Sequence, residues 1–313
     1  MSSIDERERR YRTAEQALWR SLGVRPDEER VHLARVGTTV RVQVVGDGDP
    51  VVFLHGALTS GTSWAGLVAR LPWLRCYVVD RPGTGLSAPL GTRVRDASDV
   101  AALGGTLLPD LLDELGLEAA VVVATSFGGF FAFRGALAEP GRVRRIVEFG
   151  WSLGAPLGRM PWAIRLGNVP FLSGLATRMP VNERAVRWMF RAVGLRHAID
   201  AGQISSEAIR SYAALLNDTD TMRNEQELGR ALVSPLRGID RGLQLSEAER
   251  ASIRQPVRFI WGDGDVFGGR DIARDFVRPF PDARLEIVPG AGHSPWLDDA
   301  ELAATLVKRS LAD

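Results

Sequence analysis

The stretch "VVVATSFGGF", residues 121–130, places a serine between a run of β-branched residues and a pair of glycines. A serine at an abrupt turn from a buried strand into a helix exposes its hydroxyl at the edge of a sheet, next to free N–H groups. The usual pattern for such a turn is G-x-S-x-G, and Ala124 occupies the first glycine position here. By itself the motif fits a nucleophile, Ser126, and a purely structural turn equally well.

A serine hydroxyl becomes a useful nucleophile only when a base lies within hydrogen-bond reach and a third group orients that base. Among the four histidines, His293 follows the last predicted strand in the glycine-rich stretch "PGAGHSPW". We expect His32 and His197 to lie at the surface and His55 to support a turn. His293 is therefore the candidate base.

The orienting acid should lie at the same edge of the sheet, between the serine and the histidine in sequence. Asp263 and Asp265 both follow the penultimate predicted strand in "RFIWGDGDVFGG". We prefer Asp265 as the orienting acid and expect Asp263 to fix the turn, because aspartates beside glycine commonly serve turns. Glu148, at the end of "RIVEFG", is an alternative acid.

Acyl transfer also requires donors for the negative charge that develops on the carbonyl oxygen. The loop after "VVFLHG" offers the backbone N–H of Ala57, and the turn after Ser126 offers that of Phe127. Both groups would lie at helix N-terminal turns near the serine. They are the predicted oxyanion hole.

The elements that must position these residues alternate between short β-branched runs and longer helical segments. The runs within 50–56, 76–83, 119–126, 142–150, 256–265 and 283–293 each end in Gly, Asp, Ser or His, after an opening hairpin at 31–45. Helical spacing follows at 62–71, 99–115, 127–139 and 270–280. This order predicts an α/β fold with a mostly parallel, doubly wound sheet and its ligand site at the carboxyl ends of the strands.

Two segments depart from the alternation. Residues 1–30 predict a helical extension packed on the outside, and residues 152–235 predict an all-helical insertion, a cap, which leaves 31–151 and 236–313 as the core. Methionines and aromatic residues gather in the insertion, where core packing competes with pocket lining. The candidate substrate contacts are Leu58, Trp151, Trp188, Met189 and Trp296, and further apolar candidates are Met160, Trp162, Phe171, Met179, Phe190 and Met222.

The amino-acid composition excludes several classes of binding partner. The 39 basic and 38 acidic residues leave a net charge of +1, so no field attracts nucleic acid or an anionic membrane. One cysteine, Cys76, excludes an intrachain disulfide, and no apolar run is long enough for a signal sequence or a membrane span. We expect a cytoplasmic protein that acts on a small molecule, without a metal or an organic cofactor. Its oligomeric state stays open.

The motifs "HGALTSGTSW", "DRPGTGLS", "ATSFGG", "WGDGD" and "GAGH", in this order, resemble the α/β-hydrolase family over residues 31–313 outside the insertion. The resemblance implies a triad of Ser126, Asp265 and His293, an oxyanion hole at Ala57 and Phe127, and a helical cap. Ala124 is the one departure from the elbow pattern of the family.

Related chemistries are distinguished by residues that this chain lacks. The haloalkane dehalogenases and epoxide hydrolases that it resembles in layout use an aspartate nucleophile, whereas position 126 is serine. The "HGGPG" loop of iminopeptidase-like members and the "HGxGPG" loop of C–C hydrolase-like members are replaced by "HGALT". Esters, lactones or thioesters are the predicted substrates. The alternatives are a cofactor-free perhydrolase or acyltransferase on the same triad, and a non-catalytic ligand-binding protein on the same scaffold.

Overall fold

The centre of the protein is an eight-stranded sheet. A computed structural model describes residues 3–158, 180–234 and 238–312. Along the sheet the strands run in the order β1-β2-β4-β3-β5-β6-β9-β10. Their bounds are β1 Asp27–Leu33, β2 Thr38–Val45, β3 Asp49–Leu54, β4 Leu74–Val79, β5 Ala120–Ser126, β6 Val143–Ser152, β9 Val257–Gly262 and β10 Ala283–Val288.

Strand direction follows the predicted pattern. β1 and β2 form an antiparallel hairpin, and β2 pairs antiparallel with β4. All the other neighbouring pairs in this sheet are parallel. The α/β class and the mostly parallel sheet are therefore confirmed. Because parallel strands share a direction, the loops after β3, β5, β6, β9 and β10 open at one edge.

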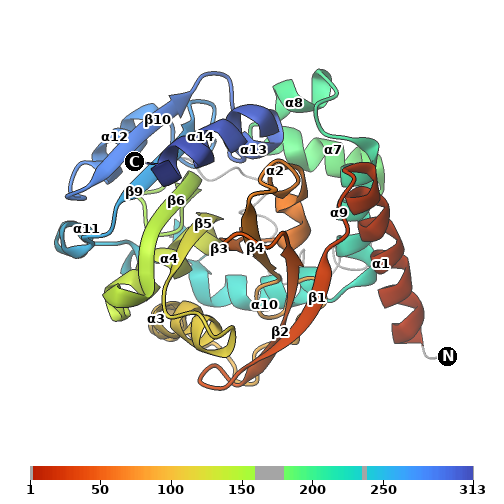
Figure 1. Cartoon of the computed structure of the whole chain (residues 1–313), viewed down its shortest axis with the longest axis horizontal. Coiled ribbons are helices and arrows are strands. Elements are labelled where there is room, and N and C mark those ends of the chain that lie inside the picture. The colour runs from red at the N-terminus through yellow and green to blue at the C-terminus, as the bar shows by residue number, and fades with distance from the viewer. Residues whose placement is uncertain (1–2, 159–179, 235–237, 313) are drawn as a thin grey trace.

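Helices cover both faces of the sheet (Figure 1). One face packs on α3 (Ala97–Glu114), α4 (Phe127–Ala138) and α12 (Arg270–Val277), and the other on α2 (Ala65–Val68), α13 (Pro295–Asp298) and α14 (Ala300–Ala312). The two-residue period of β3 explains this division, because Val52 and Leu54 enter the first core while Val51 and Phe53 enter the second. The sheet is thus buried on both sides.

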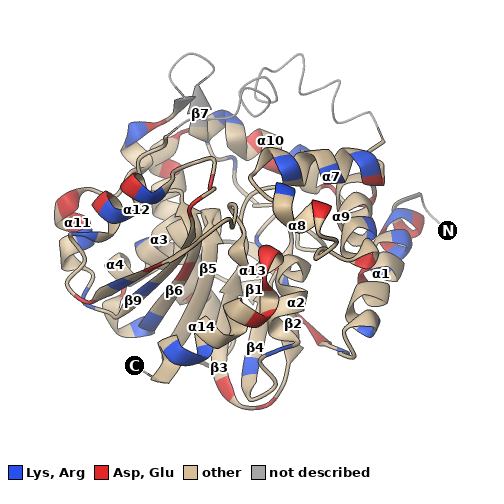
Figure 2. Cartoon of the chain, turned by 90° about the horizontal axis from the view of Figure 1, so that it is seen from above, with Lys and Arg blue, Asp and Glu red and all other residues tan. Residues whose placement is uncertain are grey.

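After β6 the chain forms α7 (Glu183–Ala192), α8 (Arg196–Asp200), α9 (Ser206–Asp218) and α10 (Thr221–Leu232). Asn182 and Ser205 cap the first turns of α7 and α9 by accepting backbone N–H bonds. Helices α7, α8 and α9 share a small hydrophobic core that includes Val186, Phe190 and Ile209. These three helices lie together beside the N-terminal helix (Figure 2).

The end of the predicted insertion pairs with the start of the second core segment, a feature that the pattern did not indicate. Val233–Ser234 (β7) pairs antiparallel with Gly238–Ile239 (β8) as a separate two-stranded sheet. Two residues are too few to produce a recognisable period, which is why an all-helical segment was expected. The division into extension, core and cap stays a prediction.

The N-terminal helix, α1 (Ser3–Ser21), lies on the outside against α9, as its pattern predicts. The short elements that complete the chain are η1 (Gly61–Trp64), η2 (Pro140–Arg142), η3 (Arg241–Leu243) and α11 (Glu247–Ser252). No helix among the described residues is long and apolar enough to cross a membrane.

Candidate active site

Ser126 occupies the sharp turn between β5 and α4. Its backbone has φ of 53° and ψ of −115°, a left-handed conformation that few residues other than glycine adopt. The turn leaves little space, because a Cβ on Gly56 would lie 3.1 Å from the Ser126 Cβ, and one on Gly128 would lie 2.1 Å from the Leu54 carbonyl oxygen. Strain of this kind persists where the surroundings enforce it and is concentrated at functional sites.

His293 and Asp265 form the pair that the sequence predicts. The His293 Nδ1 lies 2.9 Å from the Asp265 Oδ2. The same Oδ2 accepts the Trp151 N–H at 2.7 Å, while Oδ1 accepts the Phe267 N–H at 3.0 Å. With these donors around it the carboxylate is held in place, and it engages Nδ1 so that Nε2 remains for a reacting hydroxyl.

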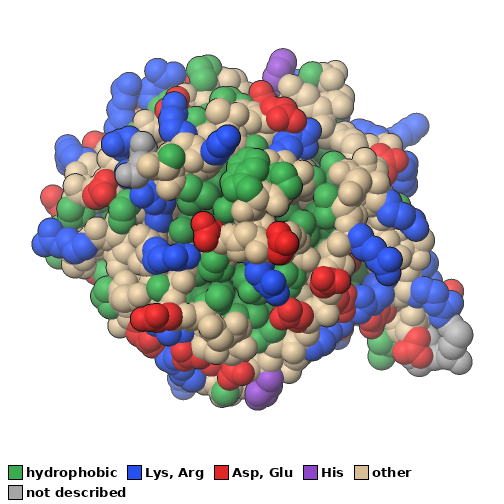
Figure 3. Space-filling model, in the orientation of Figure 1, with side chains coloured by type: hydrophobic (Ala, Val, Ile, Leu, Met, Phe, Trp, Pro, Cys, Tyr) green, Lys and Arg blue, Asp and Glu red, His purple; other side chains and the backbone are tan. Residues whose placement is uncertain are grey.

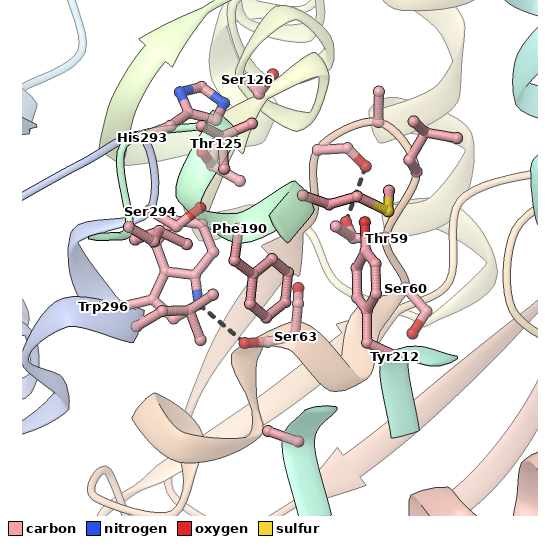
Figure 4. A pocket seen from close by; sticks show the side chains of 18 of the residues that line it. Thr59, Ser60, Ser63, Thr125, Ser126, Phe190, Tyr212, His293, Ser294 and Trp296 are labelled. Carbon is pink, nitrogen blue, oxygen red and sulfur yellow. Dashed lines mark hydrogen bonds between the residues drawn. The ribbon is translucent and has the colours of Figure 1, made fainter. Parts of the chain in front are cut away.

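Ser126 and His293 line the same cavity, and Figure 4 shows their side chains at the same end of it. The His293 loop follows β10 and makes a close contact with the carboxyl end of β6. There Gly150 has φ of 68°, and a Cβ on it would lie 2.3 Å from the His293 carbonyl oxygen. The structure therefore brings together the three residues predicted as a triad.

The remaining acids and histidines have other contacts. Asp263 accepts the Gly290 N–H at 2.7 Å, which fits its expected role in the turn. His55 is fully buried and its Nε2 accepts the Arg81 N–H at 3.0 Å, so its structural role is confirmed. His32 and His197 are exposed, as expected.

Glu148 does not fit the role of the orienting acid. It is fully buried, and burial raises the pKa of its carboxyl well above the usual range. A neutral carboxyl cannot stabilise an imidazolium as a carboxylate does. The Asp265 geometry therefore favours that aspartate as the orienting group.

The two predicted oxyanion donors border the same cavity. Phe127 is the first residue of α4, so its N–H belongs to the unpaired amides of a helix N-terminus. The Ala57 N–H donates to no acceptor among the described residues. Phe127 directly follows Ser126, and Ala57 directly follows Gly56, which lies against the serine. Their role as oxyanion donors stays a prediction.

The cavity has a volume of about 790 Å³ and is mostly apolar. All five candidate substrate contacts line it: Leu58, Trp151, Trp188, Met189 and Trp296. Trp296 also braces a loop, because its indole Nε1 donates to the Ser63 carbonyl oxygen at 2.8 Å (Figure 4). On the face of the molecule seen in Figure 3, hydrophobic side chains gather near the centre, between acidic and basic ones.

Of the other apolar candidates, Phe190 and Met222 line the cavity. Met160, Trp162, Phe171 and Met179 lie outside the described residues. Substrate contact by any of these side chains stays a prediction. Sequence reasoning missed Leu18 of α1 and Leu22, just after that helix, as part of the cavity wall, because no local pattern indicates where an outer helix docks.

The charged residues of the cavity wall are mainly acidic. Within the described part of the chain they are Glu225, Asp298, Asp299, Glu301 and Arg70, besides His293. Arg70 is engaged, because its Nε donates to Glu301 at 2.6 Å. No cluster of His, Cys, Asp or Glu that could hold a metal ion occurs among the described residues.

Comparison with known proteins agrees with this geometry. Residues 51–305 match the model of the alpha/beta hydrolase family. The chain belongs to this family. The hydrolase is 30% identical, over 252 residues, to a 2-hydroxy-6-oxononadienedioate/2-hydroxy-6-oxononatrienedioate hydrolase from Cupriavidus pinatubonensis, which covers 78% of this chain and 80% of the relative.

Two solved structures have the same fold as this hydrolase. Naproxen esterase from Bacillus subtilis matches with a TM-score of 0.74 and 20% identity, covering 99% of both chains. A 2-hydroxy-6-oxo-6-phenylhexa-2,4-dienoate hydrolase from Rhodococcus matches with a TM-score of 0.73 and 19% identity, covering 92% of this chain and 99% of the other. At these identities the likeness shows the fold alone.

Proposed function

We propose that this enzyme is a serine hydrolase that cleaves an ester, lactone or thioester of a small, largely apolar substrate through an acyl-enzyme. The observation that carries the proposal is the combination of the left-handed Ser126 with the hydrogen-bonded His293 and Asp265 at one end of an apolar cavity. A serine that only forms a turn needs neither an oriented imidazole nor an adjoining cavity.

In the proposed reaction His293 Nε2 takes the Ser126 proton while Oγ attacks the acyl carbon. The Ala57 and Phe127 N–H groups stabilise the resulting oxyanion, and the imidazolium returns the proton to the leaving alcohol or thiol. Water then attacks the acyl-enzyme by the same route and releases the acid. Asp265 keeps the imidazole oriented throughout. This chemistry needs neither a metal nor an organic cofactor.

The helices α7, α9 and α10 supply part of the cavity wall, which supports the proposed role of this segment as a cap over the site. Apolar walls from Trp188, Met189 and Phe190 suit an apolar acyl or alcohol group. The acceptor of the acyl group is proposed to be water. An alcohol or hydrogen peroxide as acceptor would make the enzyme an acyltransferase or a perhydrolase.

Hydrolysis of a carbon–carbon bond is the second candidate. The similarity to relatives named as oxononadienedioate hydrolases favours it. A dioate carries two carboxylates, however, and the described cavity wall offers acidic residues and one arginine that is already paired. The charge of the wall therefore favours an uncharged substrate.

The test is a substrate panel run with the wild type and with Ser126→Ala. The panel contains acyl esters, lactones, acyl thioesters and an oxo-dienedioate, with products identified by mass spectrometry. We expect turnover of uncharged esters or lactones that falls by about 10⁶-fold in the variant, as loss of a serine nucleophile predicts. Turnover of the dioate alone would favour the second candidate. Binding of an apolar ligand without any product would indicate a non-catalytic protein.

A further inference from the structure

Arg81 is a buried cation beneath the loop that carries Ala57. Its side chain is 1% exposed, and its guanidinium donates to the carbonyl oxygens of His55 at 3.0 Å and Gly56 at 2.8 Å. The guanidinium carbon also lies 4.8 Å from the centre of the Phe127 ring. One side chain therefore contacts both segments that bear the candidate oxyanion donors.

The bond to Gly56 fixes the direction of the next N–H. The protein has no cis peptide bond among its described residues, so the Gly56 carbonyl and the Ala57 N–H point in opposite directions. Because that carbonyl accepts from Arg81, and from the Thr59 hydroxyl at 3.0 Å, the Ala57 N–H points away from the guanidinium. A flipped peptide would lose these bonds and remove the donor.

The same loop is also held by Glu225 of α10. The Glu225 Oε1 accepts from Arg81 at 2.9 Å, and Oε2 accepts the Leu58 N–H at 3.1 Å. Leu58 has φ of 56°, a conformation that is unfavourable for a residue with a Cβ. The carboxylate thus bonds to both the cation and the strained residue that follows Ala57.

α10 is itself anchored next to this loop. The Gly85 N–H donates to the Thr221 Oγ1 at 2.9 Å, and the Asn224 Nδ2 donates to the Gly83 carbonyl oxygen at 2.8 Å. These bonds attach the helix to the turn after β4 without involving residues 55–58. When one of these bonds is lost, the other still holds α10 beside the turn.

We propose that Arg81 and Glu225 form a clamp that holds the Gly56–Ala57 peptide and Leu58 in the orientation needed for the oxyanion hole. Glu225 is then a positioning residue, through which the helical segment after β6 controls catalysis in the core. The inference rests on the proposed hydrolase function. It predicts that loss of the clamp impairs the transition state and leaves substrate binding nearly unchanged.

The experiment compares wild type, Glu225→Gln, Arg81→Lys and Asn224→Ala on the best ester of the panel. Glu225→Gln replaces one acceptor oxygen by a donor, and Arg81→Lys keeps the buried charge but cannot reach His55, Gly56 and Glu225 together. We expect kcat to fall about 10²- to 10³-fold in both, the usual effect of losing one oxyanion donor, with KM changed less than about threefold. Asn224→Ala cuts the neighbouring contact and should lower Tm with kcat unchanged.

A second readout separates positioning from a general loss of structure. An alkyl boronic acid, which forms a tetrahedral adduct with a serine nucleophile, should bind both clamp variants at least about tenfold more weakly than wild type. The binding of an uncleaved amide analogue of the substrate should not change. Circular dichroism confirms that each variant is folded.

Several outcomes overturn the proposal. They are unchanged kcat in Glu225→Gln and Arg81→Lys, an equal loss in Asn224→Ala, or a rise confined to KM, which would make Glu225 a substrate contact. An inactive wild type that a fluorophosphonate does not label would overturn the hydrolase function and this inference together. An active wild type with unaffected clamp variants would overturn the clamp alone.

Discussion

Two aspartates near His293 differ in how their charges are compensated. Asp265 accepts three hydrogen bonds, from His293 and from the backbone of Trp151 and Phe267. Asp298 accepts only the Gly292 N–H, at 2.8 Å, and its Oδ1 has no partner among the described residues. Burial raises the pKa of Asp298 from its ordinary value of 3.8 to about 6. Hydrogen bonds therefore fix the Asp265 carboxylate beside His293, whereas ionisation of Asp298 is unfavourable.

Asp298→Asn should therefore stabilise the protein at neutral pH. The folded protein holds a proton that the unfolded chain releases between about pH 4 and 6, so the free energy of unfolding falls as the pH rises through that window. Asparagine stays neutral and keeps an oxygen for the Gly292 N–H. We expect Tm of the variant to exceed that of wild type at pH 7 to 8, with the difference vanishing below about pH 4. A difference that does not vary with pH would contradict this account of Asp298.

At the scale of the elements, the turn between β5 and α4 depends on one close approach. The sequence drew attention to Ala124, but the close approach between α4 and the backbone of β3 is at Gly128. Ala124 lies within β5 and contributes its methyl to the hydrophobic core between the sheet and α4. The alanine in the elbow motif is therefore accommodated as a core residue. The nearness of helix and strand is set at Gly128.

Gly128→Ala tests this assignment. Its methyl would lie 2.1 Å from the Leu54 carbonyl oxygen, so α4 would have to move away from β3 and carry the Phe127 N–H with it. We expect a loss of about 1–3 kcal/mol in unfolding free energy, measured by urea denaturation, together with a fall in kcat. Gly141→Ala is the control, because nothing lies within 4 Å of its added methyl. Equal effects in the two variants would show that the close approach at Gly128 is unimportant.

At the scale of the whole molecule, α1 is joined to the core by a buried ion cluster. Glu15 of α1 accepts from the two terminal nitrogens of Arg41 at 2.7 and 2.6 Å, and Arg41 is fully buried in β2. The Arg41 Nε donates to Asp80 at 2.9 Å, and Asp80 also accepts the Gly61 N–H that begins η1. The ion cluster thus connects the N-terminal helix to β2 and to the start of η1.

Glu15→Ala should destabilise the whole chain. Removing one carboxylate leaves the buried Arg41 with Asp80 as its main partner, and breaking a buried pair typically costs about 3–5 kcal/mol. Glu286→Ala is the matched control, because it breaks an ion pair with Arg309 whose side chains are both at least half exposed. That pair should contribute less than about 1 kcal/mol. A single unfolding transition shifted equally by the two substitutions would refute the structural role of the cluster.

Local patterns predicted much of the fold and the candidate site. Runs of β-branched residues predict the strands, and the residues that follow parallel strands lie at one edge of the sheet. For this reason Ser126, Asp265 and His293 could be chosen from the sequence. The partners of Arg81 could not, because Glu225 lies 144 positions away and neither residue stands in a periodic pattern that joins them. The position of α1 against the cavity could not be predicted either, because it depends on tertiary contacts that leave no local pattern in the sequence.

The most direct test of the central claim is to trap the acyl-enzyme. Wild-type protein would be mixed with a slowly turned over ester, quenched in acid, weighed intact, and digested to locate the added mass. We predict one acyl group per chain, on the peptide that contains Ser126, and none in Ser126→Ala. Hydrolysis that proceeds without an adduct on this serine, or an adduct on a different residue, would contradict the account.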